Sequence, residues 1–191
     1  EDSFASGING NQPDNSAMVA GAAYVFTRTL GTWTQQAYLK SSNPWTQDIF
    51  GSSVGVSGDT VVVGAWGEDS AAKGVNGNQS DDSAPLAGAA YVFVRNGSAW
   101  SQLAYVKSSN PGAFDELGRS VAVADETVVA GAWLEDSAAT LVNGDQGDNS
   151  ASGAGAAYVF HIVQDPWSDA GSGLAGVAGV PTLVGSGSLR K

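Results

Sequence analysis

The sequence has no cysteine, a single histidine and few basic residues among its 191 positions. Without cysteine there is no disulfide, no thiol nucleophile and no thiolate-bound metal. Eight Lys and Arg against 19 Asp and Glu give a formal net charge of -11. This balance argues against a nucleic-acid partner, because phosphate backbones are bound by basic patches. No apolar run reaches the roughly 18 residues of a membrane-spanning helix, so we expect no membrane insertion.

Glycine is abundant instead, with 26 residues interspersed among Val, Ala, Tyr and Trp. This composition is typical of many short strands joined by tight turns. No segment shows the 3.6-residue period of an amphipathic helix. The sequence therefore predicts an all-β protein.

An internal repeat is the strongest pattern in the chain. The hexapeptide Gly-Ala-Ala-Tyr-Val-Phe occurs at 21–26, 88–93 and 155–160, with a constant step of 67 residues. The tripeptide Glu-Asp-Ser keeps this step at 1–3, 68–70 and 135–137. Trp33, Trp100 and Trp167 keep it too. Such regularity indicates tandem duplication of one structural unit.

Each repeat predicts four strands, which in the central copy are 50–57, 60–66, 89–95 and 100–107. Gly58-Asp59 and residues 96–98 are the turns of the two hairpins. A four-stranded repeat is typical of a propeller blade, which buries its faces against neighbouring blades. The recurring aromatic residues are predicted to pack in this way: Tyr24, Phe26, Trp33, Tyr38, Trp66 and their copies.

The predicted fold is an incomplete β-propeller of about two and a half four-stranded antiparallel blades. Blades occupy residues 1–163, as a partial first blade (1–49), a full blade (50–116) and a third blade (117–163). Residues 164–191 are a Gly-rich tail, interpreted as a linker or the start of another β module. Because propellers have roughly 4–8 blades, we expect either a fragment of a longer protein, which we favour, or chains that complete a ring together.

Paired motifs connect the repeat with a known family. Phe50-Gly51 with Gly64-Ala65, and their copies Leu117-Gly118 with Gly131-Ala132, resemble the FG-GAP repeat of bacterial type, related to the integrin α-chain propeller. The resemblance implies a seven-bladed propeller used for adhesion or ligand binding, in a secreted or cell-surface bacterial protein. Integrins hold calcium between the FG and GAP strands. The corresponding connections, 57–60 and 124–127, are too short to surround a cation.

A different loop is the candidate for calcium. Each repeat has a polar loop with side-chain oxygens at relative positions 0, 2 and 5, which Ca²⁺ prefers. The candidate ligands are Asn9, Asn11, Asp14, Asn76, Asn78, Asp81, Asn143, Asp145 and Asp148. The Glu-Asp pairs at 68–69 and 135–136 could complete the shell. The alternative is that these residues form the Asx-turns of ordinary surface loops. We predict no other cofactor.

The function predicted from these features is non-catalytic binding or adhesion, with loops contacting a protein or glycan. Trp45, whose copy is Gly112, is a candidate for ligand contact. We expect no enzyme, since His161 has no partner His or Cys, and we interpret the acidic pairs 115–116 and 125–126 as solvated turn charges. Two alternatives stay open. One is a structural protein that assembles with copies of itself, and the other is the non-catalytic portion of a larger secreted enzyme.

Overall fold

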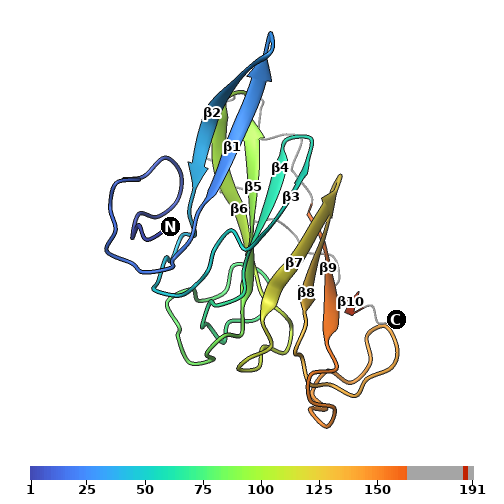
Figure 1. The fold of residues 1–191 in the computed structure, drawn as a ribbon. Helices are drawn as coiled ribbons and strands as arrows, with labels where there is room; N and C mark the ends of the chain where they lie inside the picture. The colour runs from blue at the N-terminus through green and yellow to red at the C-terminus, as the bar shows by residue number, and fades with distance from the viewer. Residues whose placement is uncertain (163–186, 189–191) are drawn as a thin grey trace, which may run out of the picture.

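The computed structural model describes residues 1–162 and 187–188, and their regular elements are all β-strands in three antiparallel sheets (Figure 1). Blade 1 contains β1 (Ala23–Thr29) and β2 (Thr32–Leu39). Blade 2 contains, in spatial order, β3 (Ser53–Ser57), β4 (Thr60–Ala65), β5 (Ala89–Asn96) and β6 (Ala99–Val106). Blade 3 contains β7 (Leu117–Ala124), β8 (Thr127–Ala132), β9 (Ala156–His161) and β10 (Gly187–Ser188).

This architecture confirms the predicted incomplete propeller with its 67-residue repeat. The described residues contain no helix that could cross a membrane. The predicted domain boundary at residue 163 and Trp167 lie outside the described residues. Of the tail, only β10 is described, and it pairs with β9.

Strand alternation gives blade 2 two buried faces. On β4, Val61 and Val63 pack in the core shared with blade 1, whereas Val62 packs in the core shared with blade 3. On β5, Tyr91 and Phe93 likewise face blade 1. Successive side chains of a strand point to opposite faces, so the central part of a strand that packs against a blade on each side is apolar on both faces. This explains why the Val61–Val63 run does not alternate with polar residues.

The aromatic prediction holds where a neighbouring blade covers the sheet. Tyr91 and Phe93 are fully buried, but their copies Tyr24 and Phe26 in blade 1 are 45% and 52% exposed. Within the described part of the chain, no sheet lies on that face of blade 1. Trp33 is also exposed, so the expectation that the first set of aromatics packs between blades was wrong for these residues.

The first strand of blade 2 begins later than predicted, at Ser53 instead of residue 50. Phe50 instead forms a parallel bridge with Gly21 of the preceding repeat. Gly51 follows with a φ of 93°, and a turn closes between the Ser52 amide and the Ile49 carbonyl at 3.2 Å. Residues 50–52 are therefore a crossing point between repeats, and the ladder of β3 starts after them.

Glycines at these crossings explain the FG and GA pairs of the repeat. A Cβ added to Gly64 would lie 2.0 Å from the carbonyl oxygen of Gly118 in the next blade. A Cβ on Gly51, the glycine of the FG pair, would lie 2.2 Å from the carbonyl oxygen of Ala22 in the preceding repeat. Both separations are far below van der Waals contact, so only glycine allows the backbones to approach in this way.

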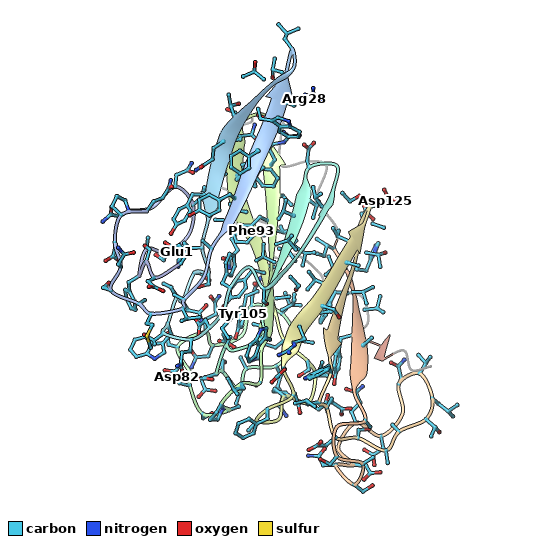
Figure 2. All side chains as sticks on the ribbon, viewed as in Figure 1. Glu1, Arg28, Asp82, Phe93, Tyr105 and Asp125 are labelled. Carbon is cyan, nitrogen blue, oxygen red and sulfur yellow. The ribbon has the colours of Figure 1, made fainter. Side chains whose placement is uncertain are left out.

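The two ends of the sheets differ. Within the described residues, short hairpin turns lie at one end of the sheets, and the long connections, residues 40–52, 66–88, 107–116 and 133–155, lie at the other, which we call the loop end (Figure 1). Figure 2 shows Arg28 and Asp125 near the hairpin turns and Asp82 among the loops at the opposite end. A rigid set of sheets that presents its long loops on one side is a common arrangement for binding surfaces.

Candidate functional site

The loop end contains two equivalent junctions between repeats. Connector 1 (residues 40–49) and connector 2 (residues 107–116) follow the outer strands of blades 1 and 2. Long loop 1 is residues 1–22, long loop 2 is residues 66–88 and long loop 3 is residues 133–155. Junction 1 is connector 1 with long loops 1 and 2, and junction 2 is connector 2 with long loops 2 and 3.

Asn43 is the centre of junction 1. Its Nδ2 donates to Glu68 Oε1 at 3.1 Å and to the Gln79 carbonyl at 3.0 Å. Its Oδ1 accepts from the Tyr91 hydroxyl at 2.6 Å. The neighbouring Ser42 hydroxyl bonds Gln79 Oε1. One amide side chain thus ties connector 1 to long loop 2 and to β5.

Asn110 makes the same contacts in junction 2. Its Nδ2 donates to Glu135 Oε1 at 3.0 Å and to the Gln146 carbonyl at 2.8 Å, and its Oδ1 accepts from the Tyr158 hydroxyl at 2.6 Å. The hydroxyl of Ser109 bonds Gln146 Oε1. The hydrogen-bonded framework is therefore duplicated together with the sequence.

A buried ion pair lies under junction 1. Lys107 Nζ is 2.7 Å from Glu68 Oε2, both side chains are buried, and the Tyr105 hydroxyl donates to Glu68 Oε1 at 2.8 Å. Burial lowers the pKa of Lys107 from its ordinary value, against the pull of Glu68. Burial also raises the pKa of Tyr105, so its hydroxyl stays a donor. Lys40 and Glu1 form the corresponding pair in repeat 1 at 3.0 Å, with Glu1 partly exposed.

Two further carboxylates anchor the connectors. Asp48 Oδ2 accepts from the Trp45 amide at 2.8 Å, and Asp115 Oδ2 accepts from the Gly112 amide at 2.7 Å. Burial raises the pKa of Asp48 to about 7 and that of Asp115 to about 6, and neighbouring carboxylates add to both shifts. Asp115 and Glu116 are buried, so the interpretation of this pair as solvated turn charges was wrong. The turn-like sequence around them forms an inter-blade connector instead.

Junction 1 opens into a pocket of about 380 Å³. Long loop 1 contributes Phe4 and Ser6 to its wall, connector 1 contributes residues 42–45, and long loop 2 contributes Gln79, Ser80 and Asp82. Phe4 and Trp45 are 46% and 56% exposed, and their rings meet edge to face with centroids 5.9 Å apart. The pocket thus combines an exposed aromatic pair, which offers apolar contact, with a mainly polar wall, which offers hydrogen bonds.

Junction 2 presents other side chains on the same framework. Ala71, Gly112, Gly147 and Asn149 stand where junction 1 has Phe4, Trp45, Ser80 and Asp82. The aromatic pair therefore belongs to junction 1 and has no counterpart in junction 2. The residues that bond the loops together are therefore the same in both junctions, whereas the residues exposed to solvent differ.

The candidate calcium ligands of long loops 1 and 2 bond backbone amides. Asn9 Oδ1 accepts from the Tyr38 amide at 2.9 Å, and Asn76 Oδ1 accepts from the Tyr105 amide at 2.9 Å. Asp14 Oδ2 accepts from the Phe4 amide at 2.8 Å. Asp81 Oδ2 accepts from the Ala71 amide at 3.0 Å. In each copy the asparagine therefore fastens the loop to the outer strand, and the aspartate closes it.

The remaining candidates form local turns. Asn78 accepts from the Ser80 amide, Asp145 from the Gly147 amide and Asp148 from the Ser150 amide, at 3.0–3.1 Å. Asn143 has a φ of 56°, like Asn9 and Asn76, and Asn11 accepts through its backbone carbonyl from the Ser3 hydroxyl at 2.9 Å. The amide of Phe4 is the first cause of a lowered pKa at Asp14, and the hydroxyl of Ser83 is the first cause at Asp81.

The Glu-Asp pairs that were predicted to complete the calcium shell make other contacts. Glu68 serves Lys107, Tyr105 and Asn43, while Asp69 Oδ1 accepts from the Leu86 amide and Asp136 Oδ1 accepts from the Gly153 amide. Among the described residues, no group of three or more His, Cys, Asp or Glu is close enough to hold a metal ion. The Asx-turn geometry is present in these loops, and calcium binding stays a prediction.

The junctions also have a repeated string in the sequence, which does not belong to the FG-GAP motifs. The string Ser-Ser-Asn-Pro occurs at 41–44 and again at 108–111, and an aspartate follows four residues later in both copies. Each of these residues is common in loops, so composition alone does not distinguish Asn43 or Asp48 from ordinary turn residues.

These sheets and junctions define a propeller-type repeat protein. The FG-GAP repeat family matches residues 33–93 and 100–160, and the chain belongs to this family. Each match begins on the outer strand of one blade and ends on the third strand of the next, so the family repeat spans a junction. Such repeats are generally non-catalytic and suggest a propeller-like binding or adhesion module. A search of curated proteins found no match.

Proposed function

We propose that this chain is part of a secreted or cell-surface binding module that contacts its ligand, a protein or a glycan, through the loop end. The observation that carries this proposal is the pocket of junction 1, where Phe4 and Trp45 expose aromatic surface between two long loops. Exposed large aromatic side chains in a hollow mark interaction sites more often than scattered apolar residues do.

The shape of junction 1 supports this function because the pocket is built on rigid parts. Asp48 fixes the backbone at Trp45, and Asp14 fixes the backbone at Phe4. Asn43 ties connector 1 to long loop 2 and to β5. A pocket whose walls are already ordered loses little entropy when a ligand binds.

A binding assay that assumes no ligand class tests the proposal. The labelled chain is applied to arrays of immobilised extracellular-matrix proteins and of glycans, beside a Phe4→Ala/Trp45→Ala variant and a Trp33→Ala control. Trp33 is an equally exposed tryptophan at the hairpin end, so its loss controls for general stickiness. We expect binding that the double variant loses and the control keeps. Absence of wild-type binding to both arrays, or equal binding by the double variant, overturns the proposal.

Assembly between chains is a second candidate, favoured by an uncovered hollow between β1 of blade 1 and β3 of blade 2. A groove of about 470 Å³ there is lined by Tyr24, Phe26, Val54 and Val56 among others. In blade 3, Val121 and Val123 stand in place of Val54 and Val56 and pack against blade 2. If a second copy covers this groove, light scattering will show mass rising with concentration and Val56→Lys will prevent it. A monomer at all concentrations rejects assembly.

Calcium in the long loops is a separate part of the proposal, supported by the oxygen-rich side chains of Asp14, Asp81 and Asp148. Because these carboxylates already bond backbone amides, an ion has to share or replace those bonds, and we expect weak binding. Calorimetric titration with CaCl₂ tests it. Absence of both heat and a gain in melting temperature removes it.

A further inference from the structure

We infer that the pocket of junction 1 binds a neutral saccharide, with one sugar ring against Trp45 and its hydroxyl groups bonded by long loop 2. This inference rests on the proposed binding function and specifies its ligand. It is carried by three features of the pocket, which are its aromatic corner, its polar wall and its charge.

The aromatic corner supplies the apolar contact. The Trp45 and Phe4 rings are inclined at 66° to each other, with centroids 5.9 Å apart, and each is about half exposed. One face of a pyranose ring is lined by C–H groups, and it covers an exposed indole without leaving a polar group unpaired. The volume of about 380 Å³ is at the small end of the range for small-molecule sites. It suits a short saccharide better than a folded protein surface.

The polar wall supplies hydrogen bonds of both kinds. Ser80 and Asp82 expose their side chains at the mouth of the pocket. A carboxylate accepts from sugar hydroxyls, while a serine hydroxyl both donates and accepts. Asn43 also lines the pocket, but its amide is committed to Glu68, Gln79 and Tyr91. Asn43 is therefore a positioning residue, and Ser80 and Asp82 are the ligand-contacting residues.

The charge of the pocket selects among saccharides. Its lining, which belongs entirely to the described part of the chain, contains no Lys or Arg. Asp82 lies on the wall, and Glu68, Asp69 and Asp82 are each close enough to the buried Asp48 to contribute to its raised pKa. An anionic sugar such as a uronate or sialate would meet the exposed Asp82 carboxylate, with no cationic side chain in the lining to compensate it. The neutral class is the one that this wall accepts.

The second junction provides an internal control for the assignment. It keeps the framework around Asn110 but has Gly112 and Ala71 in the aromatic positions and Asn149 in place of Asp82. Ligand binding at junction 1 therefore predicts a stoichiometry of one saccharide for each chain, although the framework occurs twice.

Calorimetric titration of the full chain tests the inference. The probes are neutral saccharides, first as an array of neutral glycans and then as the methyl glycoside or oligosaccharide that the array selects, with methyl glucuronide as the anionic control. We expect one site per chain, at least tenfold weaker binding in Trp45→Ala, and partial retention in Trp45→Phe, which keeps a stacking ring. Methyl glucuronide should not bind.

Asp82→Asn distinguishes a saccharide from a cationic peptide, the competing ligand for an acidic aromatic pocket. An amide still bonds hydroxyl groups, so saccharide affinity should fall only a few fold and depend little on salt, whereas a Lys- or Arg-bearing peptide should lose most of its affinity. The inference is overturned if no neutral glycan binds, if Trp45→Ala leaves affinity unchanged, or if only cationic peptides bind. If the arrays show protein binding that needs Trp45 but no glycan binding, the proposed function stands and the saccharide inference fails.

Discussion

The two junctions of the loop end differ in what they present and agree in what they bury. Asn43 and Asn110 bond equivalent partners, and Asp48 and Asp115 anchor equivalent amides. At the surface, however, Trp45 in junction 1 corresponds to Gly112 in junction 2. The repeat therefore keeps the same buried hydrogen bonds in each junction and allows the side chains at a few solvent-exposed positions to differ. Those positions are the ones where ligand specificity can arise without loss of fold.

The largest effect should come from breaking the buried ion pair beneath junction 1. In Lys107→Met, the Glu68 carboxylate loses its cation in a buried setting, and removal of one partner of such a pair typically costs about 3–5 kcal/mol. Urea or thermal unfolding measures the loss. Lys40→Met is the matched control and should cost less, because its partner Glu1 is partly exposed to water.

A second variant keeps this prediction testable if the first does not fold. Lys107→Met/Glu68→Gln removes the uncompensated charge and should recover part of the lost stability. Equal losses in Lys107→Met and Lys40→Met would show that burial of the pair has no role in the framework.

Loss of the central amide should affect both junctions alike. Asn43→Ala and Asn110→Ala each remove one hydrogen bond from a tyrosine hydroxyl and one from a glutamate oxygen, which costs about 1–3 kcal/mol. Urea unfolding of the two variants under the same conditions measures the loss in the free energy of unfolding. If only one of them were destabilised, the frameworks would not be equivalent and the comparison would fail.

The pH dependence of stability should distinguish Asp48 from Asp115, the two carboxylates that bond the connector amides. For Asp48, with a pKa of about 7 in the folded protein, protonation is favoured by folding. Its contribution is therefore present at acid pH and is lost as the pH rises through 7. For Asp115, with a pKa of about 6, the loss occurs at lower pH.

Between pH 6 and 7 we expect Asp48 to reduce the free energy of unfolding by about 1 kcal/mol and Asp115 by about 0.3 kcal/mol. Asp48→Asn, which resembles the protonated acid, should flatten this part of the pH profile more than Asp115→Asn does. Identical profiles for wild type and Asp48→Asn would contradict the assignment.

Sequence reasoning succeeded where the signal was periodic. The step of 67 residues and the Gly-Ala-Ala-Tyr-Val-Phe copies predict strands, hairpins and blades, because strand formation follows local alternation and turn chemistry. The junctions could not be predicted in this way. Asn43 meets Glu68 and Tyr91, which are 25 and 48 residues away, and no local pattern encodes such contacts.

The same limit explains the acidic residues. Asp115 follows Pro111 and Gly112 in a segment that has the composition of a solvated turn, yet it is buried, and its carbonyl accepts from the Leu134 amide of long loop 3 at 3.4 Å. Burial of a loop residue depends on what packs over it, which a single sequence does not state. The aromatic residues of blade 1 show the opposite case, in which side chains predicted to be buried are exposed. Tyr24 has the sequence surroundings of the buried Tyr91 and differs only in lacking a neighbouring sheet within the described residues.

The smallest change in stability should accompany the exchange of the presented residues, and it is the sharpest test of the comparison. Trp45→Ala removes a half-exposed side chain and its edge-to-face contact with Phe4, which should lower stability by about 0.5–1 kcal/mol, while it weakens binding at junction 1 at least tenfold. The reverse graft places Ala71→Phe, Gly112→Trp, Gly147→Ser and Asn149→Asp on junction 2. A Cβ at Gly112 would lie 3.0 Å from Asp115 Oδ1, so the carboxylate has to shift by a few tenths of an ångström. Because Trp45 occupies the equivalent position beside Asp48, the framework should accept this change. Calorimetry should then count two sites per chain in place of one, and a folded graft that still binds a single ligand would show that the framework of junction 2 does not support a pocket.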